Sequence, residues 1–187
     1  MMRFLPALLC TILALVSQQR QVKPEKASDR SELEAALGFE VPSTGNMPGG
    51  WGGGPPGTIF VDDKVVHTGR WAARIERKAE SPNDFSALTK FLEMDFSGAT
   101  VELRGFLRTE DVSDFAGLWM REDGQSPALA FDNMQSRQLK GTTAWTEYSV
   151  SLPVSSEAKT LFFGVLLSGT GKRTPKNRVL EIGRAHV

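Results

Sequence analysis

Short segments in which apolar and polar residues alternate dominate the chain between residues 71 and 152. Alternation with a period of two is typical of β-strands that turn one face to a core and the other to water. We assign the following positions to inward faces: Trp71, Ala73 and Ile75; Phe85, Ala87, Thr89 and Phe91; Val101, Leu103 and Leu107; Tyr148, Val150 and Leu152. Leu161 to Leu167 is apolar at nearly every position, which predicts a central strand covered on both faces.

Turn-forming residues separate these segments, among them His67-Thr68-Gly69 and Lys140-Gly141-Thr142. Residues 42–58 hold seven Gly and four Pro around Trp51, so we expect a long loop there. About eight short strands with no amphipathic helix among them predict an all-β protein. The most suitable architecture is an antiparallel β-sandwich, most simply a jelly roll.

The N-terminus has the pattern of an export signal. Arg3 precedes an apolar run from Phe4 to Val16, which is shorter than the roughly 20 residues that a membrane-spanning helix needs. We therefore expect residues 1–17 to be a cleaved signal peptide and the mature protein to be secreted or periplasmic, without a membrane anchor. Residues 18–37 are predicted to be a linker with one or two helical turns that end at Gly38.

The strand pattern stops after Leu167, and a basic cluster with Pro175 at its centre follows. Residues 182–187 match a reading frame of a common sequencing adapter, so we expect this hexapeptide to be foreign to the gene. The whole segment 172–187 is suspect because of the basic cluster and the end of the strand pattern. The sequence thus predicts one domain over residues 38–171.

Composition excludes several classes of function. The 187 residues include 22 Lys and Arg against 22 Asp and Glu, without a long basic run, so no nucleic-acid partner is expected. One Cys and two His leave little material for a disulfide framework, a zinc site or a catalytic dyad. His67 is interpreted as a turn residue, and no nucleophile motif accompanies it. The residues present therefore predict a protein that is not an enzyme.

Several polar residues interrupt the strand-like segments of the sequence and could form a binding face. Arg108, Arg121, Asp132 and Asn133 offer guanidinium, carboxylate and amide groups suited to planar hydrogen bonding with sugar hydroxyls or another polar ligand. Trp51 in the glycine-rich loop could stack on such a ligand, whereas the other three tryptophans are expected in the core. The alternative is a salt-bridge network on the exposed face, with no ligand.

A structural calcium ion is a further possibility. Loop carbonyls and a carboxylate can hold calcium at strand ends, and Glu40 and Asp62 are the candidate ligands.

Four segments together resemble a known domain family: Gly105 to Val112, Ala116 to Arg121, Ala130 to Met134, and Gly141 to Trp145. They are similar to the galactose-binding-like jelly-roll domain that precedes bacterial tail-processing-type serine peptidases and erythromycin-esterase-like hydrolases. His67-Thr68-Gly69-Arg70 also resembles a turn of carbohydrate-binding modules. The family pattern ends in a strand with Gly-x-x-Trp-x-Asp-Asp, and Lys172-Arg173-Thr174-Pro175 stands there instead. The resemblance therefore implies that the domain lacks its last strand.

Three functions follow from this resemblance and remain open. The first is a non-catalytic accessory module that binds a glycan or packs on a downstream catalytic domain. The second is the N-terminal fragment of a secreted hydrolase. The third is a structural spacer.

Overall fold

The computed structural model describes residues 27–43, 45–78, 80–81, 84–95, 98–125, 128–169 and 178–186. Their elements are, in order, α1 (Ala27–Leu37), β1 (Gly52–Gly54), β2 (Ile59–Asp62), β3 (Ala72–Arg77), β4 (Phe85–Glu93), β5 (Thr100–Asp123), β6 (Ala130–Asp132), the 3-10 turn η1 (Gln135–Arg137), β7 (Leu139–Pro153), β8 (Thr160–Ser168) and β9 (Arg178–His186). The predicted signal peptide lies outside the described residues.

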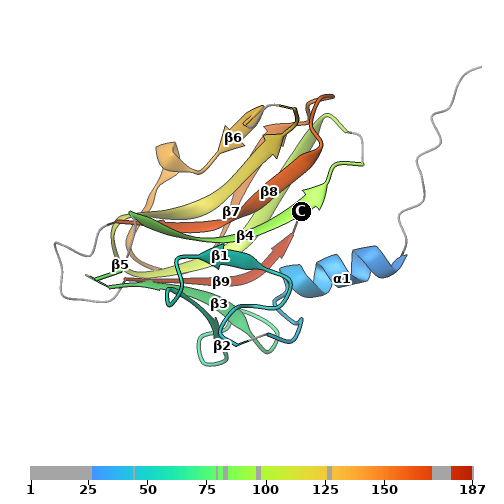
Figure 1. The fold of residues 1–187 in the computed structure, drawn as a ribbon. Helices are drawn as coiled ribbons and strands as arrows, with labels where there is room; N and C mark the ends of the chain where they lie inside the picture. The colour runs from blue at the N-terminus through green and yellow to red at the C-terminus, as the bar shows by residue number, and fades with distance from the viewer. Residues whose placement is uncertain are drawn as a thin grey trace, which may run out of the picture.

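The strands pair antiparallel and form two layers that share β5 (Figure 1). Residues 115–123 of β5 pair with β8, and β4 and β1 follow beyond it, while β6 pairs with β5 on the other side. We call these strands sheet I. The first half of β5 pairs with β7 and β9, and β3 and β2 follow beyond β9; these strands are sheet II. The predicted antiparallel β-sandwich is confirmed.

Strand β5 is longer than the sequence predicts, since the alternation of Val101, Leu103 and Leu107 covers only its first part. The structure has one continuous strand of 24 residues. Its pairing with β7 shifts register between Leu107 and Ala116, and Asp111 takes a positive φ of 52°. Such bulges bend a strand without ending it, so β5 can pass from one sheet to the other.

One hydrophobic core lies between the two sheets. Ala73 and Ile75 of β3 are fully buried, as are Leu107 of β5 and Leu161 of β8. The predicted inward faces of these strands are therefore confirmed, and β8 lies centrally between β4 and β5.

The face assignment of β4 is wrong. Ser86 and Leu88 are fully buried, whereas Phe85 and Phe91 are 54% and 62% exposed. Lys90, on the inward side, donates a 2.8 Å hydrogen bond from Nζ to the Gly50 carbonyl, and burial lowers its pKa. Polar side chains can thus face inward because distant parts of the chain supply their partners.

Helix α1 extends the predicted helical turns and lies next to β9 at the side of the sandwich (Figure 1). It ends at Leu37, directly before Gly38 as the sequence predicts, and the Gly38 N–H donates to the Glu34 carbonyl. Phe39 takes the left-handed conformation, with φ 61°, and Glu40 N–H donates back to Ala35. This is the hydrogen-bond pattern of a Schellman cap. No helix in the described ranges has the length and apolar character to cross a membrane.

The glycine-rich segment also contains a strand, where the sequence predicts a loop. Gly52–Gly54 form β1 at the edge of β4. A Cβ on Gly53 would lie 2.2 Å from the Ala87 carbonyl oxygen, so the strand can approach this closely because it has no side chain there.

The place of the expected missing strand is filled. The backbone of Arg178–His186 forms β9 between β3 and β5 of sheet II. The β-branched residues Val179 and Ile182 favour a strand, and β3 and β5 pair with it on both sides.

Candidate functional site

A line of large side chains crosses the outer face of sheet I, one from each of four adjacent strands. Phe91 on β4 lies opposite Phe162 on β8. Arg121 on β5 lies opposite Phe162 on one side and Phe131 on β6 on the other. Met120, next to Arg121 in sequence, is fully buried. Because successive side chains of a strand point to opposite faces, the line points away from the core. We call these four residues the aromatic row.

The aromatic row is exposed and its members contact one another. Phe91 is 62% exposed and Phe131 is 53% exposed. The ring centroids of Phe91 and Phe162 are 6.0 Å apart, and the Arg121 guanidinium lies 5.2 Å from the Phe162 ring centroid. Exposed large apolar groups gathered in one place are typical of interaction sites.

Arg121 is held in place by Asp123, two residues further along β5. Its Nη2 donates a 2.7 Å hydrogen bond to Asp123 Oδ2, and the N–H of Ala128 donates to Asp123 Oδ1. Burial acts to raise the pKa of Asp123, but these hydrogen bonds and the Arg121 charge outweigh it and hold the pKa below its ordinary value. The pair is therefore ionised at neutral pH, and its charges offset each other.

A polar row borders the aromatic row on the side toward the start of β8. It consists of Glu93, Thr160 and Asp123, which lie opposite one another on β4, β8 and β5. These carboxylates and the hydroxyl can accept hydrogen bonds from a ligand seated on the aromatic row.

A third row, which we call the low row, borders the aromatic row on the side toward the end of β8. Thr89, Gly164 and Trp119 lie opposite one another on β4, β8 and β5. Gly164 has no side chain, and Trp119 is part-exposed beside it. The Trp119 Nε1 atom is inaccessible and has no partner among the described residues. The part-exposed Trp119 ring therefore lies next to the aromatic row on β5.

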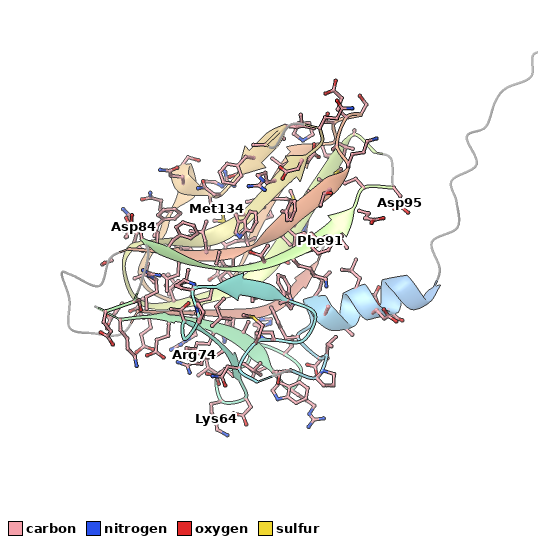
Figure 2. All side chains as sticks on the ribbon, in the orientation of Figure 1. Lys64, Arg74, Asp84, Phe91, Asp95 and Met134 are labelled. Carbon is pink, nitrogen blue, oxygen red and sulfur yellow. The ribbon has the colours of Figure 1, made fainter. Side chains whose placement is uncertain are left out.

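The chain after β6 forms the edge of this face, opposite the edge at β4 that carries Phe91 (Figure 2). Met134 is 2% exposed. The backbone N–H of Leu118 points to its sulfur, with 3.3 Å between Leu118 N and Met134 Sδ. The Met134 Cβ lies 3.0 Å from where a Cβ on Gly117 would be. Met134 therefore anchors η1 to β5 in a space that a larger residue at position 117 would fill.

The structure brings three of the five predicted binding residues to the neighbouring strands β5 and β6 and the turn after them, and leaves Arg108 and Trp51 elsewhere. Arg121 lies in the aromatic row, and Asp132 lies on β6 opposite Met120, followed by Asn133. Arg108 is in the half of β5 that belongs to sheet II. It is therefore separated from Arg121 by 13 residues of strand, or roughly 40 Å if the strand were straight.

The polar groups at this edge are already engaged. Asp132 Oδ1 accepts from the Met134 N–H and Oδ2 from Arg137 Nη2, at 2.8 and 2.9 Å. Asn133 Oδ1 accepts from the Gln135 N–H at 3.1 Å. These bonds shape η1 and use the carboxylate of Asp132 and the amide oxygen of Asn133.

The prediction that Trp51 is an exposed stacking residue is wrong. Trp51 is 8% exposed, and its Nε1 donates a 2.8 Å hydrogen bond to the Ala36 carbonyl at the end of α1. Its ring stacks on Phe39 at 5.4 Å and meets Phe163 edge-on at 5.9 Å. The glycine-rich chain around it folds against β4 and so places the indole in the core. Trp119 and Trp145, expected in the core, are part-exposed instead.

The salt-bridge alternative describes the arginines of β5 well. Arg104, Arg108 and Arg121 each pair with a carboxylate two residues away on the same strand, namely Glu102, Glu110 and Asp123. Residues two apart on a strand share a face, so these pairs are local. Such exposed pairs contribute little to stability, so they do not by themselves explain the pattern.

The two candidate calcium ligands are used by the protein itself. Glu40 Oε1 accepts the Arg70 N–H at 2.8 Å. Asp62 Oδ1 accepts the Lys64 N–H at 2.7 Å, and Oδ2 lies 3.1 Å from Arg74 Nε. In the part of the chain that the structure describes, no three His, Cys, Asp or Glu side chains gather to hold a metal ion. The described residues therefore do not fit a calcium site built on Glu40 and Asp62.

Sequence reasoning missed the phenylalanines of the aromatic row. Phe91 was assigned to the core because alternation cannot tell which face of a strand is buried. Phe162 belongs to the apolar run from Leu161 to Leu167, in which periodicity does not distinguish the two faces. One signal was available: β4 and β8 both carry apolar residues on both faces, which is more than a one-sided sheet needs.

Comparisons with known proteins support the fold. No protein-family model matches the chain. The chain is 33% identical over 115 residues to the uncharacterized HTH-type transcriptional regulator YbfP of Bacillus subtilis, covering 60% of this chain and 39% of that protein. It thus spans about two fifths of the length of this curated relative.

Similar solved structures are β-sandwiches. The CBM22-1 xylan-binding domain of Xyn10C from Paenibacillus barcinonensis has a TM-score of 0.54 at 13% identity, over 79% of this chain and 88% of that one. The Stig cyclase Fisc from Fischerella sp. TAU has a TM-score of 0.53 at 15% identity, over 81% and 92%. A carbohydrate-binding module of the β-sandwich superfamily has a TM-score of 0.53 at 9% identity, over 75% and 57%. The chain therefore has the fold that carbohydrate-binding modules use.

Proposed function

We propose that this chain is a non-catalytic module that binds a carbohydrate on the outer face of sheet I. The observation that carries the proposal is the aromatic row, in which Phe91 and Phe131 expose more than half of their surface. The C–H faces of a pyranose ring pack well on aromatic rings, and the flanking polar groups can bond its hydroxyls. The fold supports this function, since solved structures with the same architecture include a xylan-binding domain.

Affinity gel electrophoresis of the full chain tests the proposal. We expect the protein to be retarded by at least one soluble polysaccharide and the double variant Phe91→Ala/Phe131→Ala to migrate as it does in an empty gel. Lys140→Ala, at an exposed position of β7 in sheet II, is the control and should be retarded like the wild type. If no neutral or acidic polysaccharide retards the wild-type protein, the proposal is wrong.

A second candidate function rests on the relationship to YbfP. Because the chain matches 39% of a protein named as a transcriptional regulator, a module of this kind could sense an effector within a longer protein. The balance of 22 basic and 22 acidic residues argues against direct contact with DNA. The same sugar-binding face would then serve as a sensor, and an electrophoretic mobility shift with duplex DNA should show no complex for this chain.

The location and context of the module are part of the proposal. We infer that residues 1–17 direct export, that residues 38–171 form the module, and that it accompanies a catalytic domain in a longer protein. Mass spectrometry of the protein recovered from a bacterial periplasm tests the first point, since cleavage after Ser17 would remove the apolar run. Recovery with Met1 in place would contradict it.

A further inference from the structure

The aromatic row also indicates which kind of glycan suits the face and how it lies. Resting on the proposed carbohydrate-binding function, we propose that the site takes a neutral, extended glycan that runs across the strands, from Phe91 to Phe131, and not along any one of them.

The direction follows from the spacing of the aromatic groups. Adjacent strands lie about 4.8 Å apart, so the row from β4 to β6 offers an unbroken series of platforms over about 14 Å. The spacing between adjacent strands, about 4.8 Å, is close to the length of one pyranose unit in an extended chain. Along β4, in contrast, Phe85 and Phe91 are six residues apart, which is roughly 20 Å, with Ala87 and Thr89 between them. A chain laid along the strand would therefore lack support in its middle.

The preference for a neutral ligand follows from the charges beside the row. Asp123 holds Arg121 at 2.7 Å, so the guanidinium charge is offset. The exposed Glu93 and the part-buried Asp123 lie in the polar row, immediately next to the aromatic row. Across these two rows one cation therefore faces two carboxylates. A polyuronate would be repelled, whereas neutral sugar hydroxyls can donate to the carboxylates.

Isothermal titration calorimetry of the full chain with xylohexaose, a neutral β-linked oligosaccharide, tests the direction. Phe91→Ala and Phe131→Ala remove the two ends of the row, and each should weaken binding about tenfold, as loss of an aromatic anchor does. Phe85→Ala is the matched control, because it removes an equally exposed ring from the same face of β4. It should leave the dissociation constant unchanged. Melting curves of the three variants establish that each is folded.

The two possible arrangements give opposite results. If Phe85→Ala weakens binding as much as Phe91→Ala does, while Phe131→Ala has no effect, the glycan runs along β4 and the proposed direction is wrong. Equal binding by all variants also overturns it, because the ligand then lies elsewhere on the molecule.

Titration with polygalacturonate tests the charge preference. We expect xylohexaose binding to be insensitive to added sodium chloride and polygalacturonate binding to be at least tenfold weaker. Tighter polygalacturonate binding that falls with salt would overturn the preference for a neutral ligand but leave a carbohydrate-binding function in place. If neither xylohexaose, polygalacturonate nor any polysaccharide tested by affinity electrophoresis binds, the proposed carbohydrate-binding function is wrong.

Discussion

Nη1 of Arg77 on β3 donates a 2.6 Å hydrogen bond to Oγ of Ser86 on β4, and this bond joins the two sheets across the core. Arg77 is 1% exposed and Ser86 is fully buried. Arg77 Nε also donates to the Gly169 carbonyl, just after β8. A buried guanidinium is tolerated where its donors are matched, so this contact defines how the layers are aligned.

Replacement of Ser86 should therefore destabilise the protein. Ser86→Ala removes the acceptor of a buried charged donor, and we expect the free energy of unfolding to fall by about 1–3 kcal/mol. Urea denaturation measures this change. Ser151→Ala, at an exposed position on β7, should leave the midpoint within error. Equal midpoints for the two variants would mean that the bond does not stabilise the fold.

Gly164 should tolerate no side chain. A Cβ there would lie 1.9 Å from the Leu88 carbonyl oxygen of the neighbouring strand. Gly164→Ala should force β4 and β8 apart and cost about 3 kcal/mol, the upper end of overpacking penalties. Gly52→Ala is the control, because its Cβ would meet nothing closer than the Thr89 carbonyl at 3.9 Å. If Gly164→Ala and Gly52→Ala have the same melting temperature, the close approach of Gly164 to the Leu88 carbonyl is contradicted.

Trp51 and Trp119 should behave in opposite ways. Trp51→Phe loses the hydrogen bond to Ala36 and should lower stability by about 1–3 kcal/mol without changing glycan affinity. Trp119→Phe should leave stability nearly unchanged but remove the change in tryptophan fluorescence on ligand binding. Titrations followed by fluorescence separate the two effects. A ligand-induced signal that survives in Trp119→Phe but is lost in Trp51→Phe would reverse these roles.

The Asp123 carboxylate should make stability depend on pH. Because its folded pKa lies below the ordinary value, the ionised form stabilises the fold at neutral pH, and this contribution is lost as the pH falls below about 4. Asp123→Asn should therefore be less stable than the wild type at pH 7, and the difference should shrink toward pH 3. Asp95→Asn, at an exposed position, serves as the control. A difference that stays constant over this range would show that the charge of Asp123 is not involved.

The sequence predicted the fold well where a strand has one apolar face. In β3 and β7 the alternating residues Ile75 and Val150 are buried as expected, because burial of apolar surface dominates the choice of face. In β4 the rule failed. Ser86 and Lys90 turn inward because Arg77 and the Gly50 carbonyl meet them there, and neither partner is near in sequence.

The candidate site was predictable in part. The sequence identifies Arg121 and Asp132 as polar interruptions in strands; they lie on the neighbouring strands β5 and β6, where Asp132 is opposite the fully buried Met120. Phe91 and Phe162 could not be identified, since only the strand order places them in one line with Arg121. Trp51 was misplaced because a glycine-rich segment predicts a loop, whereas the backbone approach of β1 to β4 is a tertiary contact.

The sharing of β5 by both sheets has a consequence for cooperativity. A strand that supplies hydrogen-bond partners to β7 and β9 in one sheet and to β6 and β8 in the other cannot separate from either alone. The two layers should therefore open as one unit, and the slowest-exchanging amides of both should report the same opening free energy. A sugar held on the outer face of one layer would then protect the amides of the other, although it touches none of them.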